Sequence, residues 1–358
     1  MGRLLATGFS VTALSVTAFS VVSIMAAASC SSVVAQNADS GDFDLQAHRG
    51  GLGRVTENTI ESFTNALEIG VTTLELDTQI TEDGVAVVTH DRRVSDEKCI
   101  DTQPVAPDDP EFPYVGKYVN TLTLGQVQTL DCGSMPLTDH PDQRTVPGVT
   151  IPTLQAVLDL VGSVDAPGVT LNVETKVEAG SPSETAPRSE FVETVLDTIR
   201  DSGFLDRVTI QSFDWGALQL VRRLEPSVPV VALTNGDFLQ EGQEGASPWL
   251  GGIDIDDFGG DPIAAIDSFD ASALSPVQGT PQGGKVSDPD FRLYVTQDMI
   301  DSAHASGIAV IPWTVDDPET MNVLMDMGVD GIITDYPDRL RTVMNDRGLP
   351  LPPAVDVN

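Results

Sequence analysis

The sequence has few basic side chains for its length of 358 residues. Lys and Arg together number 19 against 54 acidic residues, which gives a formal net charge of −35. A nucleic-acid-binding surface needs an excess of basic side chains to displace counterions, so DNA and RNA are excluded as expected partners. An anionic substrate would have to meet locally concentrated positive charge or a bound cation.

Charge is absent from residues 4–28, an apolar stretch that follows the basic Arg3. We interpret residues 1–35 as an export signal rather than a membrane anchor, because Ser, Thr, Ala and Gly dilute its hydrophobicity. Cleavage would follow Ala35, or would use a loose lipobox that ends at Cys30 and becomes lipidated. We therefore expect a periplasmic, extracellular or lipid-anchored protein without an integral membrane span in its mature form.

Cysteine is also scarce, and processing leaves only Cys99 and Cys132 as free thiols. An even pair of thiols in an oxidising compartment is expected to form a disulfide. Two unrelated buried thiols would be the weaker alternative after export. The bridge would close a segment that directly follows His90, so we expect its reduction to raise KM more than it lowers kcat.

From residue 44 onward, short β-rich runs alternate with amphipathic patterns. Nine strands are expected, at residues 44–47, 73–80, 85–89, 169–173, 208–212, 229–233, 271–274, 309–313 and 331–334. Seven helices are expected, at residues 59–67, 154–161, 190–201, 215–224, 296–306, 319–327 and 337–344. This alternation predicts parallel strands joined by crossover helices, and eight such units close into a (β/α)8 TIM barrel.

Two segments interrupt the alternation. Residues 92–150, after the second strand region, are acidic and rich in Pro, and residues 235–262 are rich in Gly. We interpret both as insertions, because neither has enough apolar periodicity for a core of its own. The barrel domain is expected to span residues 44–346, followed by a C-terminal tail at residues 347–358.

Charged residues gather on the expected strands near the ends where a barrel carries its active site. Glu75 and Asp77 are two positions apart on one strand and therefore share a face. Two such carboxylates repel each other unless a proton or cation lies between them, and a hard divalent cation takes oxygen ligands. Glu174 and Lys176 share the face of another strand in the same way.

Two of the four histidines, His48 and His90, follow strands beside these charged residues. The other two, His140 and His304, lie in an insertion and on a helical face, where solvated side chains are expected. Each feature alone has a structural explanation, such as a hydrogen-bonded core histidine or a structural ion pair. Their joint placement on one barrel face indicates an active site.

The order and spacing of short motifs resemble those of the glycerophosphodiester phosphodiesterase family over nearly the whole chain after residue 44. The matching segments are His48-Arg49-Gly50, Glu57-Asn58-Thr59, Glu75-Leu76-Asp77, Thr81-Glu82-Asp83-Gly84, His90-Asp91, Ile151-Pro152-Thr153-Leu154, Asn172-Val173-Glu174-Thr175-Lys176, Gln211-Ser212-Phe213-Asp214, Pro312-Trp313-Thr314-Val315 and Gly331-Ile332-Ile333-Thr334-Asp335-Tyr336-Pro337. The chain departs from the family pattern at Thr56, where Pro is usual, and in a longer segment after His90-Asp91.

The resemblance implies a metal-dependent TIM-barrel enzyme that hydrolyses small-molecule glycerophosphodiesters to sn-glycerol 3-phosphate and an alcohol. The attacking oxygen would be water, or a glycerol hydroxyl that forms a cyclic phosphate. By position, the resemblance implies these roles: Glu75, Asp77 and Glu174 as ligands of one divalent cation, Ca²⁺ or Mg²⁺; His48 and His90 as general acid and base; Arg49 and Lys176 as phosphate contacts; Phe213 and Trp313 in the substrate pocket; and Glu57 as a further ligand or a support of the ligands.

Two other functions are compatible with these motifs. A phospholipase D-like relative acting on lysophospholipids or sphingomyelin would share the barrel, the metal and the histidines. It would favour an apolar entrance, against which the acidic insertion argues. A non-catalytic exported binding protein would have lost site residues, yet both histidines and all three carboxylates are present.

Overall fold

The computed structural model describes residues 1–2, 8 and 43–357, so the expected export signal lies almost entirely outside the described residues. The described chain contains a barrel of eight parallel strands in the order β12-β9-β8-β7-β6-β2-β1-β13. These strands are β1 (Asp44–Ala47), β2 (Thr73–Ile80), β6 (Thr170–Thr175), β7 (Val208–Ser212), β8 (Val230–Thr234), β9 (Ala273–Pro276), β12 (Ala309–Val310) and β13 (Gly331–Thr334). The predicted barrel is confirmed.

Backbone hydrogen bonds close the barrel between its last two strand segments. Asp330 N donates to Val310 O, and Ile333 N donates to Pro312 O, each at 3.0 Å. These hydrogen bonds bring the two ends of the strand order together.

One of the nine expected strands is not a barrel strand. The strand expected at residues 85–89 is β3 (Ala86–Val88), which pairs antiparallel with β2. Only residues 81–85 connect the two strands, which is too short for the crossover that parallel strands need. Gly84 has a φ of 75° in this turn, so the Thr81-Glu82-Asp83-Gly84 motif forms a hairpin.

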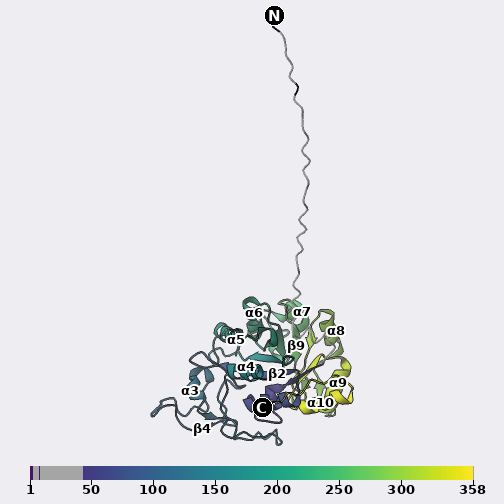
Figure 1. Cartoon of the computed structure of the whole chain (residues 1–358). Helices are drawn as coiled ribbons and strands as arrows, with labels where there is room; N and C mark the ends of the chain where they lie inside the picture. The colour runs from purple at the N-terminus through teal and green to yellow at the C-terminus, as the bar shows by residue number, and fades with distance from the viewer. Residues whose placement is uncertain (3–7, 9–42, 358) are drawn as a thin grey trace. The chain divides into compact units, whose positions relative to one another are not determined.

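Helices surround the strands, as Figure 1 shows. They are α2 (Ile60–Ile69), α4 (Leu154–Ser163), α5 (Arg188–Ser202), α6 (Trp215–Leu224), α7 (Pro262–Asp267), α8 (Gln297–Ala305), α9 (Pro318–Met327) and α10 (Pro337–Asp346). The seven expected helices are present, and α7 is an additional short one whose apolar run is too brief to give a helical period. The Gly-rich segment before it contains three 3₁₀ turns, η4 (Asp237–Leu239), η5 (Pro248–Leu250) and η6 (Ile255–Phe258).

The alternation of side chains along β2 directs its carboxylates into the barrel. Leu74 and Leu76 are fully buried in the apolar core, which includes residues of the surrounding helices. Because successive side chains of a strand point to opposite faces, Glu75 and Asp77 lie on the interior face. The β2–β6 register pairs Asp77 with Glu174, which places carboxylates from two neighbouring strands at the same level.

The insertion between β3 and α4 has an apolar cluster of its own, so the expectation that it lacks a core is wrong. Tyr114 and Leu122 are fully buried in this cluster, together with Val127 and Leu130. These residues come from turns and very short elements, which is why no apolar period marks them in the sequence. The elements are β4 (Ile100–Asp101), η2 (Val119–Thr121), α3 (Leu124–Val127) and β5 (Leu130–Asp131).

The predicted disulfide between Cys99 and Cys132 is present in the insertion. It lies beside the antiparallel pairing of β4 with β5, in which Ile100 is opposite Asp131. A second short hairpin, β10 (Gly279–Thr280) with β11 (Arg292–Leu293), follows β9.

Residues after α10 return to the N-terminal part of the barrel. Val355 N donates to Leu67 O of α2 at 2.9 Å, and Arg341 Nη1 donates to Pro352 O at 2.6 Å. The tail is therefore packed against the domain. Within the described ranges, no helix is both long enough and apolar enough to cross a bilayer.

Candidate active site

β1 leads into a tight turn, η1 (His48–Gly50), that carries the first histidine and arginine of the site. Arg49 has a φ of 52°, in the left-handed region that non-Gly residues rarely adopt. Gly50 follows with a φ of 79°, and a Cβ there would lie 2.9 Å from the backbone nitrogen of Phe63. The turn directs the Arg49 backbone nitrogen to Glu75 Oε2 at 2.8 Å. The His-Arg-Gly motif therefore has a conformational basis, because its Gly has no room for a side chain.

Three buried carboxylates, Glu75, Asp77 and Glu174, each place one oxygen within 4.8 Å of the others. Burial raises the pKa of Glu75 well above its usual range, and Asp77 and Glu174 add to the effect. Burial also raises the pKa of Glu174, to about 7. For Asp77, burial is outweighed by the cations Arg49 and Lys176, which lower its pKa.

Two cations and two amides hold these carboxylates. Arg49 Nε is 3.1 Å from Asp77 Oδ2, and Lys176 Nζ is 3.1 Å from Glu174 Oε1. The Asn58 amide donates to Asp77 Oδ2 at 2.9 Å, and the Gln211 amide donates to Glu75 Oε1 at 2.7 Å.

One buried oxygen of the cluster, Asp77 Oδ1, has no hydrogen-bond partner among the described residues. The nearest cation, Lys176 Nζ, is 3.5 Å from this oxygen. A buried carboxylate oxygen without a hydrogen bond is costly unless something else contacts it. Three carboxylates that converge with such an oxygen fit a hard cation with oxygen ligands, such as Ca²⁺ or Mg²⁺.

His48 is held by an aspartate that follows β13. Its Nδ1 lies 2.5 Å from Asp335 Oδ1, and the Asp335 backbone nitrogen donates to Asp316 Oδ1 at 2.9 Å. Burial lowers the pKa of His48 to about 3, and Arg49 contributes to the shift. A neutral imidazole whose Nδ1 donates to a carboxylate has Nε2 free as a base.

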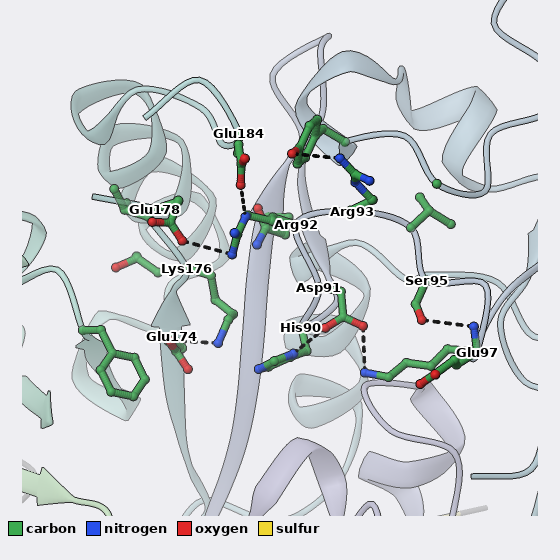
Figure 2. A pocket seen from close by; sticks show the side chains of 18 of the residues that line it. His90, Asp91, Arg92, Arg93, Ser95, Glu97, Glu174, Lys176, Glu178 and Glu184 are labelled. Carbon is green, nitrogen blue, oxygen red and sulfur yellow. Dashed lines mark hydrogen bonds and ion pairs between the residues drawn. The ribbon is translucent and has the colours of Figure 1, made fainter. Parts of the chain in front are cut away.

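His90 is held in the same way by the residue that follows it. Its Nδ1 is 2.7 Å from Asp91 Oδ1 (Figure 2). Asp91 Oδ2 is 2.8 Å from Lys98 Nζ. Burial lowers the pKa of His90 to about 4, with further contributions from Lys176 and Arg49. Burial therefore favours the neutral form of both histidines of the site, and each is oriented through Nδ1.

The site comprises an inner cavity and an outer groove that share lining residues. The inner cavity has a volume of about 290 Å³ and is lined by both histidines, by Glu75 and Glu174, and by Phe213 and Trp313. The rings of Phe213 and Trp313 meet edge to face with their centroids 5.4 Å apart. The outer groove, of about 1040 Å³, shares His90, Glu174 and Phe213 with the inner cavity.

Ion pairs line one wall of the outer groove (Figure 2). Arg92 lies 3.0 Å from Glu178 Oε2 and 2.5 Å from Glu184 Oε2. This wall is charged close to the inner cavity, in keeping with the polar entrance expected from the sequence.

The structure brings the sequence-predicted residues together, with Glu57 at the periphery. Arg49, Lys176 and eleven further residues line the inner cavity, and Asp77 contacts both of these cations. Glu57 is outside the three-carboxylate cluster of the described chain. Its two oxygens are each 3.2 Å from Arg49 Nη1, and Oε1 is 2.9 Å from Lys98 Nζ. In the structure, Glu57 therefore contacts two cations, Arg49 and Lys98.

Several residues at the site carry no role in the prediction from sequence. Asp91 and Asp335 each follow a strand and belong to quoted motifs, so their position at strand ends was a usable signal. Lys98 and His140 come from the insertion, where no pattern marks them. His140 is not solvated as expected, because its side chain is only 18% exposed and Nδ1 lies 3.2 Å from the Tyr336 hydroxyl.

Comparison with known proteins identifies relatives along the whole barrel. A glycerophosphodiester phosphodiesterase of Caldanaerobacter subterraneus subsp. tengcongensis is 28% identical over 302 residues, which are 84% of this chain and 98% of the relative. The crystal structure of a candidate glycerophosphoryl diester phosphodiesterase of Silicibacter pomeroyi has a TM-score of 0.69 at 29% identity, over 86% of this chain and 95% of that chain. A phosphodiesterase of Oleispira antarctica, solved with its product sn-glycerol 3-phosphate, shares the fold with a TM-score of 0.61 at 20% identity, over 86% of this chain and 99% of that chain.

A model of the glycerophosphoryl diester phosphodiesterase family matches residues 48–339. This match covers most of the chain and includes all the predicted metal, histidine and substrate positions. The chain therefore belongs to the glycerophosphoryl diester phosphodiesterase family, and the resemblance drawn from its motifs is confirmed.

Proposed function

We propose that this protein hydrolyses glycerophosphodiesters to sn-glycerol 3-phosphate and an alcohol, with one divalent cation and two histidines. Family membership supports the reaction class. The observation that carries the proposal is one cavity lined by two members of a three-carboxylate cluster and by two histidines whose Nδ1 atoms are both held by aspartates.

Glu75, Asp77 and Glu174 would hold the cation, and the oxygen-only donor set suits Ca²⁺ or Mg²⁺. A cation bound there would supply Lewis-acid stabilisation of the charge on the phosphoryl oxygens. Gln211 and Asn58 fix the orientation of two of the carboxylates through the hydrogen bonds described above. Such partners of ligands are an expected part of a metal site.

The two histidines are suited to moving protons at the two ends of the reaction. One imidazole takes the proton of the attacking hydroxyl through Nε2, and the other gives a proton to the oxygen of the leaving alcohol. The low pKa of both, about 3 for His48 and about 4 for His90, favours the unprotonated form from which a general base acts. For the imidazole that acts as acid, the negative charge of the bound phosphodiester would raise the pKa.

Arg49 and Lys176 supply positive charge beside the carboxylate cluster, in a protein whose net charge is −35. A planar guanidinium suits phosphate oxygens because it can donate two parallel hydrogen bonds. Phe213 and Trp313 provide an apolar wall against which the carbon skeleton of the substrate would pack.

The charged outer groove disfavours the phospholipase D-like alternative. An acyl chain would need an apolar path, whereas Arg92, Glu178 and Glu184 form ion pairs along this wall. Small, polar head groups are the better match. We therefore do not favour lysophospholipids or sphingomyelin as substrates.

The test is a substrate panel with and without metal. Purified protein, stripped with EDTA and then supplied with Ca²⁺, Mg²⁺ or Mn²⁺, would be assayed on glycerophosphocholine, glycerophosphoethanolamine and lysophosphatidylcholine, with release of the alcohol, choline or ethanolamine, as the readout. We expect cation-dependent release from the first two substrates and little reaction with the third. Full activity in metal-free protein would contradict the metal proposal, and inactivity on all glycerophosphodiesters would contradict the reaction.

We further propose that the mature protein is exported. The charge-free N-terminal segment supports this, and so does the Cys99–Cys132 disulfide, because disulfides persist in oxidising compartments. Cell fractionation followed by N-terminal sequencing of the mature protein would test the proposal and would distinguish cleavage after Ala35 from processing at Cys30.

A further inference from the structure

Lys98, from the insertion, contacts two parts of the active site that lie far apart in the sequence. Its ammonium lies 2.8 Å from Asp91 Oδ2 and 2.9 Å from Glu57 Oε1. The side chain is 24% exposed, so both contacts are partly shielded from water. Such a contact is worth more than an ion pair at the open surface.

Through Asp91, Lys98 is linked to His90. Asp91 accepts from the Lys98 ammonium with one oxygen and holds His90 Nδ1 with the other, at 2.7 Å. The rotamer of Asp91 is therefore set by a cation on one side and by an imidazole on the other. Loss of the cation would free Asp91 to turn toward water and would leave His90 Nδ1 without a fixed partner.

Through Glu57, Lys98 is linked to Arg49. Glu57 contacts Lys98 through Oε1 and contacts Arg49 Nη1 through both oxygens at 3.2 Å. Arg49 in turn lies 3.1 Å from Asp77 Oδ2 of the carboxylate cluster. Lys98 thus stabilises two carboxylates, those of Asp91 and Glu57. Without its ammonium, each carboxylate would have less positive charge beside it.

The backbone at Lys98 is fixed by the covalent bond next to it. Cys99 is disulfide-bonded to Cys132, and its backbone nitrogen donates to Ser95 O at 2.9 Å. The sulfur partner Cys132 is itself held by a hydrogen bond from its backbone nitrogen to Val149 O, at 2.9 Å. A long, flexible Lys side chain loses much rotamer freedom when it is fixed, and a constrained backbone reduces the additional freedom to be lost.

We propose that Lys98, kept in place by the Cys99–Cys132 disulfide, is a positioning residue that orients His90 through Asp91 and Arg49 through Glu57. This inference rests on the proposed function, because it assigns Lys98 a role in the same reaction. It gives the insertion a part in turnover as well as in the shape of the groove.

The test compares Lys98→Met and Lys98→Arg with a control lysine from the same insertion. Lys98→Met removes the charge at similar length, and we expect kcat to fall about 10- to 100-fold, the scale of outer partners of active-site groups, with a smaller rise in KM. Lys98→Arg should recover most of kcat. Lys117→Met is the control and should keep wild-type kcat and KM, since the ion pair that Lys117 forms in the described part of the chain is with Glu111.

A second readout follows His90 directly. Long-range ¹H–¹⁵N NMR of the imidazole nitrogens reports which nitrogen carries the proton, and the chain has only four histidines to assign. We expect Lys98→Met to shift the His90 nitrogens and to leave those of His304 unchanged. If Lys98→Met does not fold, Lys98→Gln provides the same comparison with a shorter neutral side chain.

The outcomes separate the two proposals. Wild-type kcat in Lys98→Met, or a loss that Lys98→Arg does not recover and that leaves the His90 nitrogens unshifted, would overturn the positioning role. A wild-type protein without turnover on any glycerophosphodiester would contradict the proposed function instead, and the NMR comparison would still test the contacts of Lys98. A Cys99→Ser, Cys132→Ser double variant should show a smaller kcat loss than Lys98→Met, and an unchanged kcat in it would overturn the role of the disulfide.

Discussion

The two histidines of the site are held by similar contacts that two different parts of the molecule provide. In the strand half, His48 at the end of β1 contacts Asp335 at the end of β13, whose side chain is 8% exposed. In the insertion half, His90 contacts Asp91, whose side chain is 32% exposed and which depends on Lys98 of the insertion. The pairing of β1 with β13 thus orients one imidazole, and a disulfide-anchored loop completes the environment of the other.

This difference indicates where the site tolerates change. Hydrogen bonds between barrel strands position Asp335, and these strands are part of the main core. Asp91 lies beside a smaller apolar cluster with fewer buried residues. Local opening requires less free energy where fewer apolar contacts are broken, so the insertion half should respond first to reduction, heat or denaturant.

The largest effect is expected at the carboxylates that both halves share. Asp77→Ala or Glu174→Ala should abolish turnover and should lower the melting temperature measured with saturating Ca²⁺ or Mg²⁺, because a bound cation stabilises the folded state by mass action. Melting curves with metal and with EDTA would check this. An equal metal-dependent rise in melting temperature in wild type and variant would contradict the ligand assignment.

Removal of either imidazole should have the next largest effect. We expect His48→Ala and His90→Ala each to reduce kcat by at least about 10²-fold, the usual scale of general acid–base catalysis, without unfolding the barrel. Circular dichroism would establish that each variant is folded. His304→Ala is the matched control, since its partner Asp330 lies outside the cavity and its kcat should equal that of wild type.

Substitution of the carboxylate that holds each histidine should affect kcat differently in the strand half and in the insertion half. Asp335→Asn should reduce kcat more than Asp91→Asn, because the buried amide at residue 335 has no access to water that could replace the lost contact. Steady-state kinetics of both variants on one substrate would check this order. Equal losses would show that the exposure of the carboxylate does not matter to the histidine that it holds.

Reduction of the disulfide should affect stability more than catalysis. Closing a loop of 33 residues should stabilise the fold by about 3 to 4 kcal/mol in the chain-entropy treatment. Sequence alone suggested that reduction would raise KM more than it lowers kcat. Because Cys99 is adjacent to Lys98, we now expect a several-fold fall in kcat as well, measurable in the double Cys→Ser variant against wild type.

The smallest effect concerns the pH dependence of stability in the strand half. Burial lowers the pKa of His48 from 6.5 to about 3, so between these values the unfolded chain binds more protons than the folded chain. The free energy of unfolding therefore loses this contribution as the pH falls below about 6.5. His48→Gln should lose less stability than wild type between pH 6.5 and 4.5 in EDTA, and parallel denaturation curves would contradict the assignment.

Much of the barrel and its site could be predicted because the signals are local. A period of two along β2 places Glu75 and Asp77 on the face opposite Leu74 and Leu76, whatever the rest of the chain does. The connection at residues 81–85 was also a local signal. Its length alone excludes a parallel pairing of β3 with β2, because such a pairing needs a longer crossover. Motif spacing then extended these local signals to a family and to its residues.

Other features depend on contacts that only the tertiary structure brings together. His48 and Asp335 are 287 positions apart, and the parallel pairing of β1 with β13, which sets Ala47 opposite Thr334, makes them neighbours. His140 and Lys98 belong to a segment made mostly of turns. In such a segment no helical or strand period predicts which side chains point toward the site. The sequence by itself determined the barrel and the carboxylates on its inner face, because backbone geometry decides which side chains share a strand face. The tertiary structure decided which partner orients each histidine, because side chains that are distant in sequence meet only when the loops between them have folded.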